Sequence, residues 1–348
     1  MLIRLYALAL ASWLLPALGA YAQPTPAPES PAHSALHTAD SAAPSAAERF
    51  TTSDLLALMA DRQKQLHYQG VLTYQSNAGT ESFRLQHWVD DGVEYQKLFY
   101  LNGPEREAVL RQHAECQSPG ARLLQQRLGN LSQNLSELEM LYDIRVLGQE
   151  RVAGRRAVTL QIVPRDNFRY GHLLSIDRDT GLLLKSLLFD EHQRVLEQFQ
   201  YVELELFNSP EAFSADTYTV IVRRVDGNRV AGCDGEMNTH PDWTLQWLPE
   251  GFAFVGQRRV RGNVDMLMYT DGLSAFSVFL DPIVGQLVIE GHAQRGATRF
   301  HMEGVKTGAD TYQMTIVGEI PLSVAERMAQ SVRRLPAAQT ASPTPGDS

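Results

Sequence analysis

The stretch PRDNFRYGHLLSIDRDTGLLLKS, from Pro164 to Ser186, decides the fold class. Asp177, Asp179 and Gly181 surround a turn in which glycine supplies a positive φ, so the runs on either side are expected to pair as an antiparallel hairpin. The second run is almost wholly apolar, and the stretch contains no recognisable catalytic apparatus. We interpret it as part of a surface that binds.

Strand-like patterns continue on both sides of this hairpin. Apolar residues fall mainly on the odd positions of residues 82–89 and on the even positions of residues 156–163, and a period of two is typical of a half-buried strand. Only one short helix, at about residues 135–142, interrupts the series, which predicts an antiparallel meander rather than a parallel sheet. The predicted strands are residues 69–75, 82–89, 93–101, 105–113, 144–149, 156–163, 172–178, 182–190 and 194–206.

An amphipathic helix is predicted before the first strand. Leu55, Met59 and Leu66 share one face of it, and Thr52 or Ser53 is expected to cap its free amides. The change from this helical period to a period of two marks the start of the sheet.

The run from Leu182 to Phe189 is apolar on both faces, which leaves two interpretations open. It is either a central strand with a helix over each face, or part of a curved sheet whose concave side forms an apolar cavity. The pattern alone favours the central strand. The candidate residues for the wall of the core or of a lipid cavity are Leu182, Leu184, Leu188, Phe189 and Phe199.

A second, smaller set of strands follows a polar, glycine-containing connector. A closing helix carries a predicted capping box of Ser323 and Glu326. Its apolar face is expected to comprise Val324, Met328, Val332 and Leu335. The strands of this set are predicted at residues 252–260, 264–270, 275–280, 287–290, 298–303 and 312–317.

The chain begins with the pattern of a cleaved signal peptide. Arg4 precedes a short apolar run that contains Pro16 and ends in small residues, which favours cleavage over a membrane anchor and predicts export. The expected organisation is a signal peptide at 1–22, a disordered Pro/Ala/Ser leader at 23–48, a large domain at 49–208, a connector at 209–240, a small domain at 241–335 and a disordered tail at 336–348.

Composition and motifs argue against several function classes. The formal net charge is −9, which does not suit a general nucleic-acid binder. The sequence lacks a G-x-S-x-G elbow, an H-E-x-x-H or C-x-x-C motif and a phosphate loop, so we expect neither an enzyme nor a metal or cofactor site. Asp177 and Asp179 could suggest calcium, but the turn interpretation is favoured. Cys116 and Cys233 either form a disulfide or remain two thiols.

Two segments carry candidate partner contacts. Arg165, Arg169 and Tyr170 could clamp an anionic group or a partner peptide, although a structural role is favoured, in which Asp166 satisfies loop amides and the aromatic residues seal the sheet edge. The segment YTDGLSAFSVFLD, from Tyr269 to Asp281, predicts a hairpin. Its aromatic residues, including Tyr269 and Phe276, are expected to be exposed, and a binding role for them is a hypothesis.

Several motifs, taken together and in order, resemble the MucB/RseB family of periplasmic sigma-factor regulators. They are YQGVLTYQ (68–75), ESFRLQHWVDDG (81–92), LNGPEREAV (101–109), PRDNFRYGH (164–172), DRDTGLLLKS (177–186), VLEQFQY (195–201), LPEGF (248–252), YTDGLSAFSVF (269–279) and IVGEIP (316–321). The segment at 118–134 does not align with the family pattern.

The resemblance implies an α+β fold that is mostly antiparallel. A large LolA/LolB-like domain, an unclosed β-barrel with an apolar cavity, would precede a smaller C-terminal α+β domain, which reverses the preference for a central strand in 182–189. The family implies binding to the periplasmic region of a membrane anti-sigma factor of the MucA or RseA type, and we expect the contact to lie mainly on the small domain and the interdomain surface. That binding would protect the anti-sigma factor from regulated proteolysis, and a lipidic signal such as lipopolysaccharide would release it.

The alternative function is a periplasmic lipid or lipoprotein carrier that uses only the large-domain cavity. The feature that distinguishes the two is the second domain, at 241–335, which a simple carrier does not need. The sequence leaves the oligomeric state open, a homodimer included.

Overall fold

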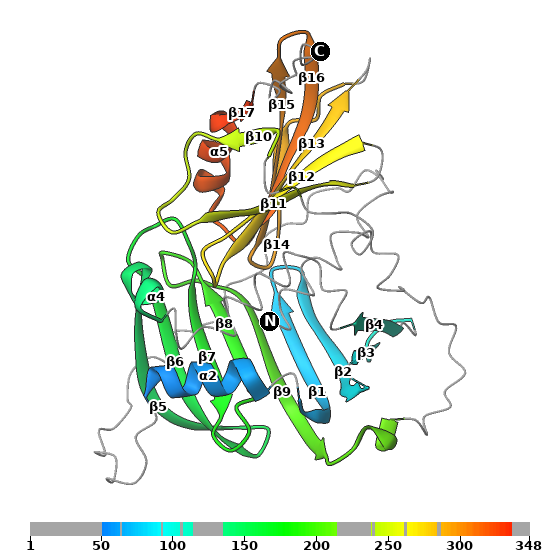
Figure 1. The fold of residues 1–348 in the computed structure, drawn as a ribbon. Coiled ribbons are helices and arrows are strands. Elements are labelled where there is room, and N and C mark those ends of the chain that lie inside the picture. The colour runs from blue at the N-terminus through cyan, green and yellow to red at the C-terminus, as the bar shows by residue number, and fades with distance from the viewer. Residues whose placement is uncertain are drawn as a thin grey trace, which may run out of the picture. The chain divides into compact units, whose positions relative to one another are not determined.

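Two large antiparallel sheets and one short strand pair account for the strands of the described residues. The computed structural model describes residues 51–62, 65–91, 93–104, 107–113, 135–213, 238, 241–260, 263–283 and 287–335. From Thr51 onward the chain forms one compact unit with a nine-stranded and a six-stranded sheet (Figure 1). No helix in these described ranges is long and apolar enough to cross a membrane.

The nine-stranded sheet has the order β4-β3-β2-β1-β9-β8-β7-β6-β5, and every neighbouring pair is antiparallel. Strands β4 and β5 form its two edges, so the sheet is not closed. This confirms the expected antiparallel meander and unclosed architecture. The strands are β1 (His67–Ser76), β2 (Gly79–Asp90), β3 (Val93–Tyr100), β4 (Glu107–His113), β5 (Tyr142–Val152), β6 (Arg155–Pro164), β7 (Gly171–Asp177), β8 (Leu183–Phe189) and β9 (Val195–Phe207).

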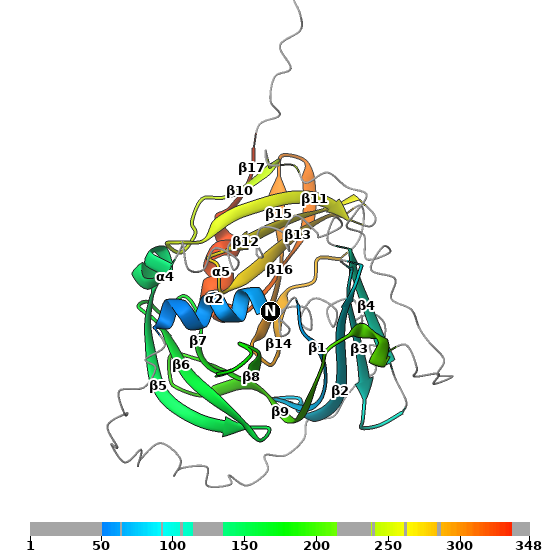
Figure 2. The same cartoon turned by 60° about the horizontal axis from the view of Figure 1, so that its bottom comes forward.

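Helix α2 (Thr52–Arg62) lies across strands β5 to β7 in both views (Figures 1 and 2). It begins with a capping box one residue earlier than expected: the Asp54 amide donates to Thr51 Oγ1, and the Thr51 amide donates to Asp54 Oδ2, both at 3.2 Å. Leu55 and Leu56 are fully buried. The prediction that Leu66 shares the helical face is wrong, because the helix ends before it.

The expected short helix is α4 (Leu135–Leu141), which precedes β5, and a 3₁₀ turn at Pro210–Phe213 follows β9. The predicted hairpin of 164–186 is confirmed as β7 and β8, with Gly181 at a φ of +74°. Strand β8 is buried on both faces, as its sequence indicated.

The six-stranded sheet has the order β11-β12-β13-β16-β15-β14, and α5 (Leu322–Ser331) packs against it. A short pair, β10 (Trp243–Leu245) with β17 (Val332–Arg334), adjoins the helix. The six strands are β11 (Ala253–Val260), β12 (Val264–Thr270), β13 (Ala275–Ile283), β14 (Gly291–Arg295), β15 (Thr298–Thr307) and β16 (Asp310–Gly318). The core between the sheet and the helix includes Trp243, Leu267, Val278, Met314, Ile316, Val324 and Met328.

Three predictions for this part are wrong. Residues 287–290 form no strand, because Ile289 bonds through its backbone to the Gln313 side chain instead of to a neighbouring strand. The capping box of the last helix does not form: Pro321 precedes the helix, and no side chain caps it. The expected apolar helix face also breaks at its end, since the helix stops before Val332 and Leu335 is 40% exposed.

Candidate functional site

A buried carboxyl organises the turn between β7 and β8. Asp177 Oδ1 accepts hydrogen bonds from the amides of Asp179 and Thr180, both at 2.9 Å, and the carboxyl pairs with Arg155. Burial alone would raise the pKa of Asp177, but the bonds from Arg155 and the two amides outweigh it and lower the pKa. Among the described residues, no group of three acidic, histidine or cysteine side chains could hold a metal ion.

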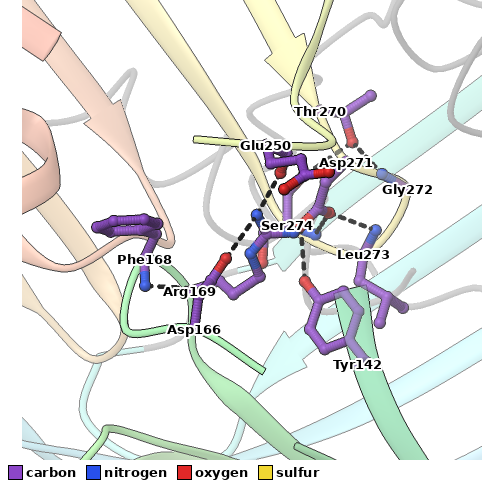
Figure 3. A network of polar contacts seen from close by, with 10 residues as sticks. All are labelled: Tyr142, Asp166, Phe168, Arg169, Glu250, Thr270, Asp271, Gly272, Leu273 and Ser274. Carbon is purple, nitrogen blue, oxygen red and sulfur yellow. Dashed lines mark hydrogen bonds and ion pairs between the residues drawn. The ribbon is translucent and has the colours of Figure 1, made fainter. Parts of the chain in front are cut away.

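The loop at residues 165–170, which we call the junction loop, carries a buried arginine between the two sheets (Figure 3). Arg169 Nη1 lies 3.0 Å from Asp271 Oδ2, and its Nη2 lies 3.1 Å from Asp166 Oδ2. Nη2 also donates to the backbone oxygen of Glu250. The guanidinium carbon lies 5.2 Å from the centre of the Phe252 ring, close enough for a cation–π contact. The planar, permanently charged fork of arginine suits such a site with several acceptors.

Asp271 is the centre of the network on the side of the six-stranded sheet. Its Oδ2 accepts from Tyr142 Oη at 2.6 Å, and its Oδ1 accepts from the amides of Leu273 and Ser274 at 2.9 and 2.7 Å. Burial raises the pKa of Tyr142 well above its usual value, and the neighbouring Asp271 raises it further, so the phenol stays protonated and donates. The network therefore links β5, the junction loop and the turn after β12 (Figure 3).

Tyr170 makes a second link from the same loop. Its hydroxyl donates to the backbone oxygen of Ile320 at 2.9 Å and accepts from Arg299 Nε at 3.4 Å. Asp166 accepts from the Phe168 amide at 3.0 Å, as the structural interpretation of this loop expected. Arg165 is exposed, with Nε donating to the Glu139 backbone oxygen, and its role as a partner contact stays a prediction.

The expectation that Tyr269 and Phe276 are exposed is wrong. Each is only 3% exposed, and their rings stack at 4.9 Å because the two residues are paired across β12 and β13 on the face that packs against α5. Arg169 and Tyr170 are likewise buried, at 1% and 2% exposure. These four candidate contact residues therefore hold the fold together in this structure.

The candidate wall residues are all buried. Leu182 and Leu184 are fully buried, and Leu188, Phe189 and Phe199 are at most 8% exposed. Strand pairing aligns Phe199 with Ser186, so Phe199 lies on the same face as Leu184 and Leu188. Whether this face lines a lipid cavity stays a prediction. Cys116 and Cys233 lie outside the described residues.

Glu197 is a site residue that the sequence patterns above did not single out. In VLEQFQY it occupies the same face of β9 as the buried Phe199 and Tyr201, and its carboxyl contacts the turn between β14 and β15. An acidic residue in an otherwise apolar alternation was the available signal.

Comparison with known proteins identifies the family. The family models for the MucB/RseB N-terminal and C-terminal domains match residues 51–219 and 237–333. The sigma factor AlgU regulatory protein MucB of Pseudomonas aeruginosa is 35% identical over 301 residues, which cover 82% of this chain and 92% of that protein. The sigma-E factor regulatory protein RseB of Haemophilus influenzae is 28% identical, with 82% of this chain and 92% of that protein covered.

Solved structures agree with this assignment. The crystal structure of MucB in complex with MucA(peri) has a TM-score of 0.63 and 34% identity, covering 82% of this chain and all of that chain. The crystal structure of MucB alone has a TM-score of 0.57 and 33% identity, covering 81% and 98% of the two chains. The similarity includes both sheets, and the chain therefore belongs to the MucB/RseB family.

Proposed function

We propose that this chain restrains an envelope-stress sigma factor by binding the periplasmic region of a membrane anti-sigma factor of the MucA or RseA type. The observation that carries the proposal is the match to MucB across both domains, together with a similar fold in a MucB structure that contains MucA(peri). The role is that of a binding regulator rather than a catalyst.

The bound anti-sigma segment is shielded from the protease that would otherwise cleave it, and a lipidic signal releases it. The physical basis is linkage: a ligand that prefers one arrangement of the two sheets lowers the affinity for the partner by the same coupling free energy, typically about 1–3 kcal/mol. The buried pair of Arg169 and Asp271 supports this mechanism, because it joins the two sheets and its separation would leave a buried charge unpaired.

The chain acts in the periplasm, to which the segment at residues 1–22 directs it as a cleaved signal peptide. The partner contacts lie on the six-stranded sheet and along the surface between the sheets, where Arg165 is exposed. A lipid or lipoprotein carrier is the second candidate, and the apolar sequence of β8 is the feature that favours it, although Leu182 and Leu184 are fully covered by protein atoms in this structure. The presence of the six-stranded sheet argues against a carrier, since a simple carrier does not need a second domain.

Calorimetric titration of the purified chain with the periplasmic region of its anti-sigma factor tests the proposal. Saturable binding is expected, and Arg165→Ala should weaken it about two- to fivefold, the range for an exposed charge contact. Arg156→Ala is the matched control, because Arg156 is an exposed arginine at the start of β6, at the other end of that strand from Arg165. Binding to lipid vesicles without any binding to the anti-sigma region would favour the carrier and overturn the proposal.

A further inference from the structure

The turn between β14 and β15 packs onto the nine-stranded sheet at the Glu197 carboxyl. Glu197 Oε2 accepts from the Ala297 amide at 3.0 Å and from Tyr74 Oη at 2.9 Å. Beside it, the Gly296 amide donates to Asn77 Oδ1 at 2.8 Å. This turn is therefore a second point of contact between the sheets, separate from the junction loop.

The Glu197 carboxyl has no cation to balance it at hydrogen-bond distance in the described structure. The residue is 5% exposed, and Oε1 is buried without a hydrogen-bond partner among the described residues. The cation of the turn itself, Arg295, lies 3.7 Å from Glu81 instead. A buried ionised carboxylate that accepts only from an amide and a phenol carries a large desolvation cost.

The turn fits the carboxyl closely. Gly296 has a φ of +59°, and a Cβ on it would overlap Glu197 Oε2. Only glycine allows the backbone to approach the carboxyl this closely. A carboxyl that gains its charge at this position must either bear a desolvation cost that its two hydrogen bonds offset only in part or move away from the turn.

The ionisable groups around Glu197 do not remove this cost. Burial raises the pKa of Glu197, and the bonds from Ala297 and Tyr74 offset only part of that rise. Tyr74 from β1 is neutral, because burial and the neighbouring Glu197 raise its pKa. Glu319, which follows β16, adds a further negative charge near Tyr74. Arg295 from β14 and Glu81 from β2 are engaged with each other.

We propose that the β14–β15 turn is a proton-responsive latch, which protonated Glu197 holds on the nine-stranded sheet and ionised Glu197 releases. When the turn lifts, the carboxyl regains water. Because the pKa of Glu197 is raised in the closed state, its stabilising contribution is fully present below the ordinary value of 4.5 and is lost as the pH rises through the closed-state pKa. The contact between turn and sheet thus weakens as the surroundings become less acidic.

Hydrogen exchange of the Ala297 and Gly296 amides in the full chain measures the latch directly. After correction for the intrinsic exchange rate, protection of both amides should fall with rising pH, by up to about tenfold per pH unit above the closed-state pKa. Glu197→Gln keeps an oxygen acceptor but cannot ionise, so its protection should be independent of pH. Protection that stays constant or rises with pH in the unmodified chain would refute the latch.

Glu81→Gln is the matched control. It removes the ion pair that Glu81 makes with Arg295 of the same turn, but it leaves the buried Glu197 carboxyl in place. This variant should therefore lower the protection of the Gly296 and Ala297 amides by the same factor at every pH, so that the dependence of protection on pH remains. If Glu81→Gln abolished the dependence while Glu197→Gln preserved it, the surface ion pair and not the buried carboxyl would control the turn, and the proposal would be overturned.

Discussion

Leu184 shows how much of the stability of the nine-stranded sheet rests on a single side chain. It is fully buried in β8, and Leu184→Ala removes apolar contacts and leaves a cavity, so the free energy of unfolding should fall by about 2–5 kcal/mol. Urea denaturation followed by circular dichroism measures the change. Leu287→Ala is the control, because Leu287 is 92% exposed and its loss should change stability by no more than about 0.5 kcal/mol. Equal losses in both variants would contradict the burial of β8.

The dependence of stability on pH that we expect from Asp177 is opposite in sign to that expected from Glu197. Its pKa is lowered in the folded state, so the stability it contributes is present above its ordinary pKa of 3.8 and is lost as the pH falls through the folded-state value. Asp177→Asn should therefore lower stability at neutral pH and flatten the loss of stability in acid, which thermal unfolding between about pH 2 and pH 7 can measure. Asp179→Asn, at an exposed carboxyl two residues further on, is the control and should retain the acid-dependent loss.

For single residues, the distance between two partners along the sequence decides whether their contact can be predicted. Asp177 and Gly181 are predictable because the turn they form is local. Arg169 stands out as a charge beside aromatic residues, but its partner Asp271 lies 102 positions away, and no local pattern connects them. The burial of Tyr269 and Phe276 escapes prediction for the same reason, since it depends on the core that the six-stranded sheet shares with residues of α5.

The β7–β8 turn also positions α2, which can be tested with two glycines. Gly181 has a φ of +74°, and a Cβ on it would lie 2.6 Å from Leu58 Cγ and 2.8 Å from the Leu58 backbone oxygen. Gly154 has a φ of +75°, and a Cβ on it would meet no atom within 4 Å. Both alanine variants place a side chain in the left-handed region, which should lower the free energy of unfolding by about 1–2 kcal/mol. Gly181→Ala should lower it by roughly 1–3 kcal/mol more, because its Cβ also displaces α2.

Chemical denaturation of the two glycine variants gives the comparison. The difference between Gly181→Ala and Gly154→Ala isolates the contact between the turn and Leu58. Equal destabilisation would mean that α2 does not rest on this turn in solution.

Elements with a clear period are predicted well from sequence, and those that depend on their neighbours are not. Strands β2 and β6 of the nine-stranded sheet are predictable because they alternate, and β8 is predictable because it is almost continuously apolar. The three-residue strands β10 and β17 are too short to show a period. Residues 287–290 have the composition of a strand, but Gln313 takes the backbone groups that a ladder would need.

At the scale of the whole molecule, polar contacts in two regions of the described structure join the sheets. The junction loop supplies the paired charges of Arg169 and Asp271, and the β14–β15 turn rests on Glu197. Buried ion pairs contribute little net stability, because desolvation offsets their attraction, but removing one partner is costly. The arrangement of the sheets should therefore be easily disrupted by the loss of one charged partner.

Arg169→Met tests whether the junction loop couples the unfolding of the two sheets. Methionine keeps the apolar stem but leaves the buried Asp271 without its cation, so the coupling between the sheets should fall by about 3–5 kcal/mol. We expect the unmodified chain to unfold in one calorimetric transition and the variant to unfold in two, since each sheet has its own apolar core. Arg165→Met, in the same loop but exposed, should retain the single transition. A single transition in Arg169→Met would show that apolar contacts, and not the buried charges, hold the sheets together.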